Sequence, residues 1–523
     1  MSEQRRTSGI LLHVTSLPGR FGCGDLGPGA ERFLDQLAAA GQGLWQVLPL
    51  GPTSMGDSPY GALSTFAGNP LLVSPERLAE DGLLDAGTLD TALPAPGGAR
   101  IDFAAARATR AELLRRAFER LEAGAAPAFG EQLAAWAAAP EQAPWLEDWA
   151  LFAALRTRFE RAPWTDWPDD LRRRRPEALA AARHELAVHL RFHRFVQYAF
   201  HRQWARLRGA AEARGIRLFG DLPIYLAGDA ADVWTRPDLF ELDEHGLPSR
   251  LAGVPPDYFA ADGQLWGNPL YRWERARAEG YAWWIARLRA QLTWFHLVRL
   301  DHFRGFAAYW EVPAGSATAR DGRWVDGPGR ALFDALRAAL GGLPLVAEDL
   351  GEITDDVVAL RRALGLPGMR VLQFGFADGK SDHRPHRLEP GIVVYTGTHD
   401  NDTTAGWFAA APEAERRRAL DYLGCTENEV PWALVREAWT SVAEVAVAPV
   451  QDLLALGTEA RMNRPGVAGG NWSWRLAEGA FDGDAIARLR RLTEVTERLA
   501  PPAPAADEAA PPPLEPAAST PAA

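Results

Sequence analysis

The amino-acid sequence predicts an α/β protein, a (β/α)₈ TIM barrel with large helical and loop insertions between strands. Short apolar runs rich in β-branched residues recur along the chain, each run closes in polar residues or in Gly and Pro, and helical patterns separate the runs. Continuous apolar strands that alternate with helices are typical of a parallel sheet covered on both faces. Eight strands are the number that the barrel needs, and a doubly wound open sheet is the alternative.

The eight predicted strands follow in order along the chain. The first two, SGILLHVTSL and LWQVLPLG, are apolar and reach Pro and Gly at their ends. The next three, IRLFGDLPIYL, FHLVRLDHF and LPLVAEDLG, are apolar until an acidic residue appears. The last three are MRVLQFGF, IVVYTGTHD and EVAVAPVQDL, and the middle one of these leads into a dense polar cluster, THDND. The predicted ranges are 8–17, 44–51, 216–226, 295–303, 343–351, 369–376, 392–400 and 444–453.

Two stretches are too long for ordinary connections between barrel strands. Residues 66–215 carry helical patterns such as AAARATRAELLRRAFERLEAG, and we expect a mostly helical insertion there. Residues 227–290 are expected to form a loop-rich insertion. The Pro- and Ala-rich tail, 501–523, has almost no residues that can pack and is expected to be disordered. Residues 1–500 would then form the catalytic barrel.

Composition limits the partner and the compartment. The net charge of −12 over 523 residues argues against nucleic acid or an anionic membrane as the main partner, because both attract a basic face. The two cysteines, Cys23 and Cys425, do not have the spacing of a zinc site or a disulfide framework. No run resembles a secretory leader or a membrane span. We therefore expect a cytoplasmic protein, and a monomer or weak homo-oligomer.

Acidic side chains end several of the predicted strands. Asp221 follows the third strand and Asp301 the fourth, Glu348 and Asp349 follow the fifth, and Asp400 follows the seventh. The C-terminal strand ends of a (β/α)₈ barrel converge on one pocket. Carboxylates gathered there would repel one another and raise one another's pKa unless the reaction uses them. The cluster therefore predicts either a metal site or a site for acid–base and nucleophilic chemistry.

The metal interpretation rests on two candidate ligand pairs, Asp301 with His302 and His399 with Asp400. A barrel hydrolase that uses metal ions generally has three or more imidazole ligands. No His-x-His sequence ends the first predicted strand. We therefore expect no metal at this site.

Glycosyl chemistry would use the same acids differently. One carboxylate attacks the anomeric carbon while a protonated carboxyl group releases the leaving oxygen, and in a retaining site the two lie about 5–5.5 Å apart. Arg299 lies two residues before Asp301, on the same strand face, where it would keep Asp301 ionised. Nearby negative charge would raise the pKa of Glu348 and keep it protonated as the acid. Asp400 would bind substrate hydroxyls and hold a distorted sugar ring.

The strings RLDHFRG, AEDLG and GTHDNDT occur in this order, together with LHVTSLPGRFGCGDLG, GDSPYGALSTFAGNP, GDLPIYLAGDAADVW, GVPPDYFAADGQLWGNPLY and ARMNRPG. They resemble the signature regions of the amylomaltases, which are the 4-α-glucanotransferases of glycoside hydrolase family 77 in the α-amylase clan. The resemblance extends to about Leu499. It implies a barrel without a C-terminal β-sandwich, α-1,4-glucans and maltooligosaccharides as substrates, and no cofactor.

The resemblance also implies roles for individual residues. Asp301 would be the nucleophile, Glu348 the general acid and base, and Asp400 the residue that stabilises the transition state. Residues 253–260 resemble a mobile loop that covers the acceptor side. Substrate contacts would come from Tyr60, Asp221, Trp266, Arg299, His399 and Asn463.

Two other functions use the same residues. An α-1,4-glucan hydrolase would need the same three acids, and only the resemblance of residues 253–271 favours transfer over hydrolysis. A noncatalytic glucan-binding protein would not need acids at three strand ends, so their presence argues against it. We expect a 4-α-glucanotransferase that moves a glucan segment to the 4-OH of an acceptor by retaining double displacement.

Overall fold

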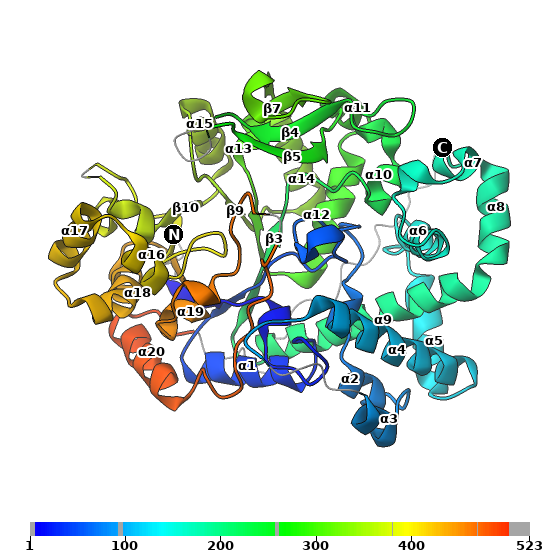
Figure 1. Ribbon diagram of the computed structural model, residues 1–523, viewed down its shortest axis with the longest axis horizontal. Helices are drawn as coiled ribbons and strands as arrows, with labels where there is room; N and C mark the ends of the chain where they lie inside the picture. Colours follow the sequence, from blue (N-terminus) through cyan, green and yellow to red (C-terminus); the bar gives the residue numbers. More distant parts are fainter. Residues whose placement is uncertain (1–5, 93–97, 257–260, 379, 468, 501–523) are drawn as a thin grey trace, which may run out of the picture.

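The computed structural model describes residues 6–92, 98–256, 261–378, 380–467 and 469–500. Its largest sheet has eight parallel strands in the order β10-β11-β12-β1-β2-β3-β6-β9, which confirms the predicted barrel (Figure 1). Each strand lies within one of the eight predicted runs or at its edge. The strands are β1 (Thr7–Leu11), β2 (Leu44–Gln46), β3 (Arg217–Leu222), β6 (Leu297–Leu300), β9 (Leu345–Ala347), β10 (Gly368–Val371), β11 (Ile392–Tyr395) and β12 (Val445–Pro449).

The strands are apolar throughout because they are covered on both faces. In β11 the sequence IVVY is buried at every position, as expected for β-branched residues in a parallel sheet. The Tyr395 hydroxyl of β11 donates to Oε1 of Gln46 on β2 at 3.0 Å. Both side chains are buried, so the barrel interior is filled by packed side chains.

The barrel closes between β9 and β10 through a few polar contacts. The Ala347 N–H donates to the Pro367 carbonyl at 2.9 Å, and Oδ1 of Asp349 accepts the Met369 N–H at 2.6 Å. Gly368 is required at this closure, because a Cβ atom there would lie 2.5 Å from Oδ2 of Asp349. The carboxylate that follows Glu348 in the chain therefore joins the two edge strands.

Helices cover the outside of the barrel. α12 packs against β3 and β6, α14 packs against α12 and α15, and α1 packs against α9 and α20. No α-helix lies between β10 and β11 in the part of that connection that the structure describes. The covering helices are α1 (Pro28–Ala39), α9 (Ala187–Glu212), α12 (Ala282–Trp294), α14 (Gly329–Leu340), α15 (Asp355–Leu364), α16 (Thr404–Ala410), α17 (Glu413–Leu423), α18 (Val430–Thr440), α19 (Val450–Leu453) and α20 (Gly483–Val495).

α15 illustrates how the sequence sets helix ends. Asp355 and Asp356 lie in its first turn and Arg361 and Arg362 in its last turn, which complements the helix dipole at both ends. Gly365 ends the helix at φ 67°, in the left-handed region that a glycine adopts without strain. α15 therefore begins just after the loop that carries Glu348.

Helices fill the long connection between β2 and β3. They form a layer beside the barrel, at the right of the view in Figure 1, and α9 returns from this layer to pack on β3. None of the described helices is long and apolar enough to cross a membrane. Those that precede α9 are α2 (Pro75–Glu80), α3 (Ala86–Thr91), α4 (Phe103–Glu122), α5 (Pro127–Ala137), α6 (Leu146–Arg158), α7 (Asp169–Arg172) and α8 (Pro176–Glu185).

A second, antiparallel sheet lies outside the barrel, in the order β5-β4-β7-β8. The sequence predicts a loop-rich segment over residues 227–290, whereas the structure places two strands there, β4 and β5, which pair with each other. β4 also pairs with β7 from a later connection. The signal of β4 and β5 is weak in the sequence because both strands are short and β4 depends on a remote partner. The elements are α10 (Ala231–Thr235), β4 (Arg250–Val254), β5 (Gln264–Pro269), α11 (Trp273–Ala278), α13 (Arg304–Ala307), β7 (Ala308–Pro313) and β8 (Arg323–Asp326).

Two predictions concern residues that the structure leaves undescribed. The tail predicted to be disordered, 501–523, lies outside the described residues. Residues 257–260 of the predicted mobile loop also lie outside them.

Candidate active site

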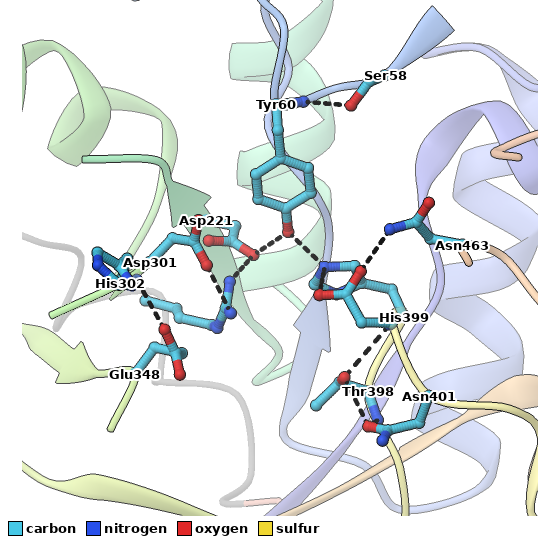
Figure 2. A network of polar contacts seen from close by, with 12 residues as sticks. Ser58, Tyr60, Asp221, Asp301, His302, Glu348, Thr398, His399, Asn401 and Asn463 are labelled. Carbon is cyan, nitrogen blue, oxygen red and sulfur yellow. Dashed lines mark hydrogen bonds and ion pairs between the residues drawn. The ribbon is translucent and has the colours of Figure 1, made fainter. Parts of the chain in front are cut away.

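The predicted site residues come together at the C-terminal ends of the barrel strands (Figure 2). Asp221 lies in β3, and Asp301, Glu348 and Asp400 follow β6, β9 and β11. Parallel strands end on the same side of a barrel, so residues distant in sequence become neighbours there. Tyr60 reaches them from the connection that follows β2, and Asn463 from the connection that follows β12.

A buried guanidinium group holds the predicted nucleophile. Nη2 of Arg299 lies 2.8 Å from Oδ1 of Asp301, and its Nη1 lies 2.6 Å from Oδ2 of Asp221. The Arg299 side chain is 4% exposed. Burial alone would lower its pKa, but the Asp221 and Asp301 carboxylates raise that pKa well above its usual value. Arg299 contacts Oδ1 and not Oδ2 of Asp301, and Oδ2 has no hydrogen-bond partner among the residues that the structure describes.

Glu348 lies beside Asp301 and is held by the backbone. Its Oε2 accepts the N–H of His302 at 2.7 Å, and its Oε1 accepts the N–H of Leu350 at 2.8 Å. Burial and, to a smaller extent, the Asp301 charge raise the pKa of Glu348 to about 7, against the opposing effect of Arg299 and the two N–H groups. The sequence predicts a raised pKa from nearby negative charge, whereas burial is the larger cause.

Asp400 belongs to a second cluster. Its Oδ1 accepts from Nδ2 of Asn463 at 2.6 Å, and its Oδ2 lies 3.4 Å from Nε2 of His399. Burial would raise the pKa of Asp400, but His399 and Asn463 lower it well below its usual value. The same contact raises the pKa of His399, although burial opposes this. The Asp400 side chain is 44% exposed, so an ionised carboxylate is accessible to a ligand.

Tyr60 joins the two clusters. Its hydroxyl donates to Oδ2 of Asp221 at 2.7 Å and lies 2.8 Å from Nε2 of His399. Its ring stacks on the His399 ring with the centroids 5.2 Å apart and the planes inclined by 19°. The aromatic face of Tyr60 and the polar side chains of four residues therefore lie together on one side of the site. The four are Asp221, Arg299, His399 and Asn463.

Trp266 lies at the edge of this arrangement, on β5. Its ring meets the His302 ring edge to face, with the centroids 4.8 Å apart, and His302 directly follows Asp301. The Trp266 side chain is partly exposed at 37%. All nine residues predicted for the site are therefore connected through direct contacts or through the intervening His302.

The structure gives His302 a role other than the metal ligation considered from the sequence, and it adds residues that the sequence did not indicate. His302 adopts φ 52° and uses its N–H to hold Glu348. Trp472 adopts φ 64° and packs with its ring 5.7 Å from that of Tyr60 and 6.0 Å from that of His399. Left-handed backbone at a bulky residue stores strain and is typical of functional sites. Arg461, which donates to the Asp400 carbonyl at 2.7 Å, lies two residues before Asn463 in ARMNRPG and could have been identified from that string.

A metal interpretation has no geometric support in the part of the chain that the structure describes. Among those residues, no group of three or more His, Cys, Asp and Glu side chains is arranged to hold a metal ion. His302 and His399 instead contact Trp266 and Tyr60. The imidazole of His399 lies 3.4 Å from the Asp400 carboxylate and 2.8 Å from the Tyr60 hydroxyl.

The fold and this set of acids define a class, the (β/α)₈-barrel enzymes that act on glycosidic bonds. Residues 12–480 match the family model described as 4-alpha-glucanotransferase. The chain belongs to this family.

Relatives that align with almost the whole chain are also 4-alpha-glucanotransferases. The chain is 50% identical over 508 residues to the 4-alpha-glucanotransferase of Thermus thermophilus, covering 95% of this chain and 100% of the relative. It is 48% identical over 499 residues to that of Synechocystis sp., covering 94% and 98%. It also resembles the solved amylomaltase from Streptococcus agalactiae in complex with acarbose, with a TM-score of 0.91, 36% identity and coverage of 94% and 100%.

Proposed function

We propose that this protein transfers an α-1,4-glucan segment from a donor to the 4-OH of an acceptor glucan or glucose, with Asp301, Glu348 and Asp400 as its catalytic residues. One observation carries the assignment of these roles. A carboxyl group whose pKa is raised to about 7, Glu348, lies next to a carboxylate paired with Arg299, Asp301. Two carboxyl groups in such different surroundings can act as acid and nucleophile at the same pH.

In the first half-reaction Glu348 gives its proton to the glycosidic oxygen. Oδ2 of Asp301, which Arg299 leaves free, attacks the anomeric carbon as the C–O bond breaks. The products are a covalent glucanosyl-Asp301 and a shorter glucan with a free 4-OH. Asp400 stabilises the positive charge that develops on the sugar ring, because it stays ionised and exposed beside His399.

In the second half-reaction the Glu348 carboxylate removes the proton from the 4-OH of the acceptor. The resulting oxygen attacks the anomeric carbon, Asp301 leaves with its electron pair, and an α-1,4 bond forms again. The anomeric configuration is inverted twice and so retained. No metal ion or cofactor takes part in either step.

The same geometry supports the proposed substrate contacts. Tyr60 offers an aromatic face, and Asp221, Arg299, His399 and Asn463 offer hydrogen bonds within the same pocket. Trp266 is partly exposed and lies beyond His302, where it provides a surface for an acceptor sugar. An acceptor held in place by such contacts competes with water by its position at the reacting centre.

Hydrolysis is the alternative outcome for the same acids. The family match and the names of the relatives support transfer instead. Noncatalytic glucan binding is not supported, because a protein that only binds glucan does not need two neighbouring carboxyl groups in surroundings as different as those of Asp301 and Glu348.

The test is a timed chromatographic profile of the purified protein with maltotriose alone. Longer maltooligosaccharides together with glucose, at a constant number of reducing ends, are the expected products. A rise in reducing ends without longer products would show a hydrolase. Asp301→Asn is the matched inactive control, and glucan binding that persists in this variant separates binding from chemistry.

We further propose that the protein acts in the cytoplasm on α-1,4-glucans and maltooligosaccharides as a monomer or weak homo-oligomer. The net charge of −12 supports a role without nucleic acid or membrane partners. Light scattering of the full chain at several concentrations tests the oligomeric state. A concentration-independent mass above that of one chain would contradict it.

A further inference from the structure

A buried carboxylate outside the pocket contacts the segment that carries Asp400. Asp452 lies in α19, directly after β12, and is 1% exposed. Its Oδ2 accepts from the Thr396 hydroxyl at 2.6 Å and from the Thr404 hydroxyl at 2.8 Å, and its Oδ1 accepts the Thr404 N–H at 2.7 Å. A buried carboxylate is costly unless hydrogen bonds satisfy it, and here these three donors come from one segment.

These donors lie at the two ends of the segment, residues 396–404, which we call the Asp400 loop. Thr396 directly follows β11, and Thr404 is the first residue of α16. Asp452 therefore holds the start and the end of the loop to the same carboxylate. Asp400 lies between them, four residues from each end.

Two more side chains hold the loop from other directions. Nε2 of Gln373, which follows β10, donates to the Asp402 carbonyl at 3.0 Å and to the Thr404 hydroxyl at 3.3 Å. The Thr458 hydroxyl donates to Oδ2 of Asp402 at 2.9 Å. Gln373 also contacts both ends of the loop, since its backbone N–H donates to the Thr396 carbonyl at 3.3 Å, whereas Asp452 holds both ends with a single carboxylate.

We propose that Asp452 is a positioning residue for Asp400, and that its hydrogen bonds to Thr396 and Thr404 fix the Asp400 loop in the conformation that stabilises the transition state. Asp452 is buried against the Asp400 loop and would not contact the substrate. The Asp400 side chain is 44% exposed, and among the described residues Asn463 and His399 contact its carboxylate, so its position also depends on the loop backbone. The inference rests on the role proposed above for Asp400.

The physical reason is geometric. Electrostatic stabilisation of a transition state depends on charges that are already in place when the charge develops. A displacement of about 1 Å can reduce turnover by up to about a hundredfold. Ground-state binding should depend less on this one carboxylate because Tyr60, Arg299 and Asn463 are also proposed to contact the substrate. Loosening the loop should therefore lower kcat much more than it raises KM.

The test compares two substitutions at Thr396. Thr396→Val keeps the shape of the side chain and removes the hydroxyl donor, whereas Thr396→Ser keeps the hydroxyl. We expect Thr396→Val to lower kcat for maltotriose disproportionation by about tenfold or more with KM changed by less than about threefold. Thr396→Ser should restore kcat to within about threefold of the original protein. Equal kcat in both Thr396 variants would overturn the proposal.

Thr493→Val is the matched control for general destabilisation. The Thr493 hydroxyl is fully buried and bonded to Gln42, Trp439 and the Leu489 carbonyl, far along the chain from the pocket residues. Its loss should lower Tm as much as Thr396→Val does and leave kcat within about twofold. A decrease in kcat that follows the decrease in Tm in both variants would show a purely structural role for Asp452.

A double-mutant cycle distinguishes an effect of Thr396→Val on Asp400 from an effect on Glu348. An α-maltotriosyl fluoride donor needs no proton from Glu348, so its cleavage reports on Asp301 and Asp400. In an Asp400→Asn background, Thr396→Val should have no further effect on this rate, because residues that act as a unit are not additive. An equal decrease in both backgrounds would overturn the proposal. Full activity of Asp400→Asn itself would instead overturn the function proposed for Asp400.

Discussion

The hydroxyl of Tyr60 lies 2.8 Å from Nε2 of His399, and this contact connects the two halves of the pocket. The Tyr60 hydroxyl donates its hydrogen bond to Asp221, so in the contact between Tyr60 and His399 the imidazole N–H is the donor. Asp221 in turn holds Arg299, which holds Asp301. The nucleophile and the Asp400 cluster therefore belong to one hydrogen-bonded network.

Tyr60→Phe tests this network because it removes the hydroxyl and keeps the ring. The buried Asp221 would lose a donor, and hydrogen bonds to charged groups contribute roughly 1.5–3 kcal/mol. We expect kcat/KM to fall by about ten- to a hundredfold while the protein stays folded. Steady-state kinetics with maltotriose and a thermal unfolding curve measure both effects.

Tyr271→Phe is the matched control. The Tyr271 hydroxyl is buried and donates to the Ile224 carbonyl at 2.8 Å, but it contacts none of the catalytic acids. This change should lower Tm and leave kcat/KM within about threefold. If both variants lose the same activity, the bridging contact of Tyr60 has no special role.

The pH dependence of donor cleavage should report the Glu348 proton. Glu348 must be protonated to act as the acid, and its pKa is raised to about 7. The kcat/KM for maltotriose should therefore be constant below pH 7 on this limb and fall about tenfold per pH unit above it. With α-maltotriosyl fluoride, which needs no acid, the fall above pH 7 should disappear. A limb that persists with the fluoride would assign the titration to another group.

Glu348→Gln should trap the covalent intermediate. The amide cannot act as a base, so a fluoride donor forms glucanosyl-Asp301 faster than an acceptor can remove it. Mass spectrometry of the intact protein should show the added mass of the glucan, and peptide mapping should place it on Asp301. Asp301→Asn with the same donor is the control and should carry no adduct. An adduct on another residue would contradict the assignment of the nucleophile.

Trp266 and Trp324 provide a matched pair for the acceptor side. Both are exposed tryptophans of the antiparallel sheet, at 37% and 39%, but only Trp266 contacts His302, whereas Trp324 covers Arg304. Trp266→Ala should lower the ratio of transfer to hydrolysis by roughly tenfold, the scale of one aromatic contact. Trp324→Ala should leave this ratio unchanged. Product analysis by chromatography with a reducing-end assay measures it.

The barrel could be predicted because each of its strands has its own signal in the sequence. A run such as IVVYTGTHD is apolar, β-branched and closed by polar residues without reference to any partner. β4 and β5 have no such signal, since β4 pairs with β7, more than 50 residues away, and β5 pairs with β4 at the edge of the sheet. The antiparallel sheet was therefore beyond prediction from local pattern.

The same distinction applies to the site. Asp301, Glu348 and Asp400 could be predicted because the first two directly follow a strand and Asp400 lies in the polar cluster that closes the run of β11. The electrostatic surroundings of these acids could be predicted only in part. Arg299 could be paired with Asp301 because both lie on the same strand. The burial that raises the pKa of Glu348 depends on the packed structure and could not be predicted. Asp452 could not be predicted, because its partners Thr396 and Thr404 lie on a different part of the chain.

The pKa of about 7 suits Glu348 to proton transfer in both half-reactions. The same carboxyl group gives a proton when a bond breaks and takes one when a bond forms, so a pKa near neutrality leaves the two forms about equally populated. A glycosidic bond of the same kind is broken and made in each cycle, so the reaction has almost no enthalpic drive. Such an enzyme spreads chain lengths toward the most random distribution, and the mixing entropy of the products sets the end point.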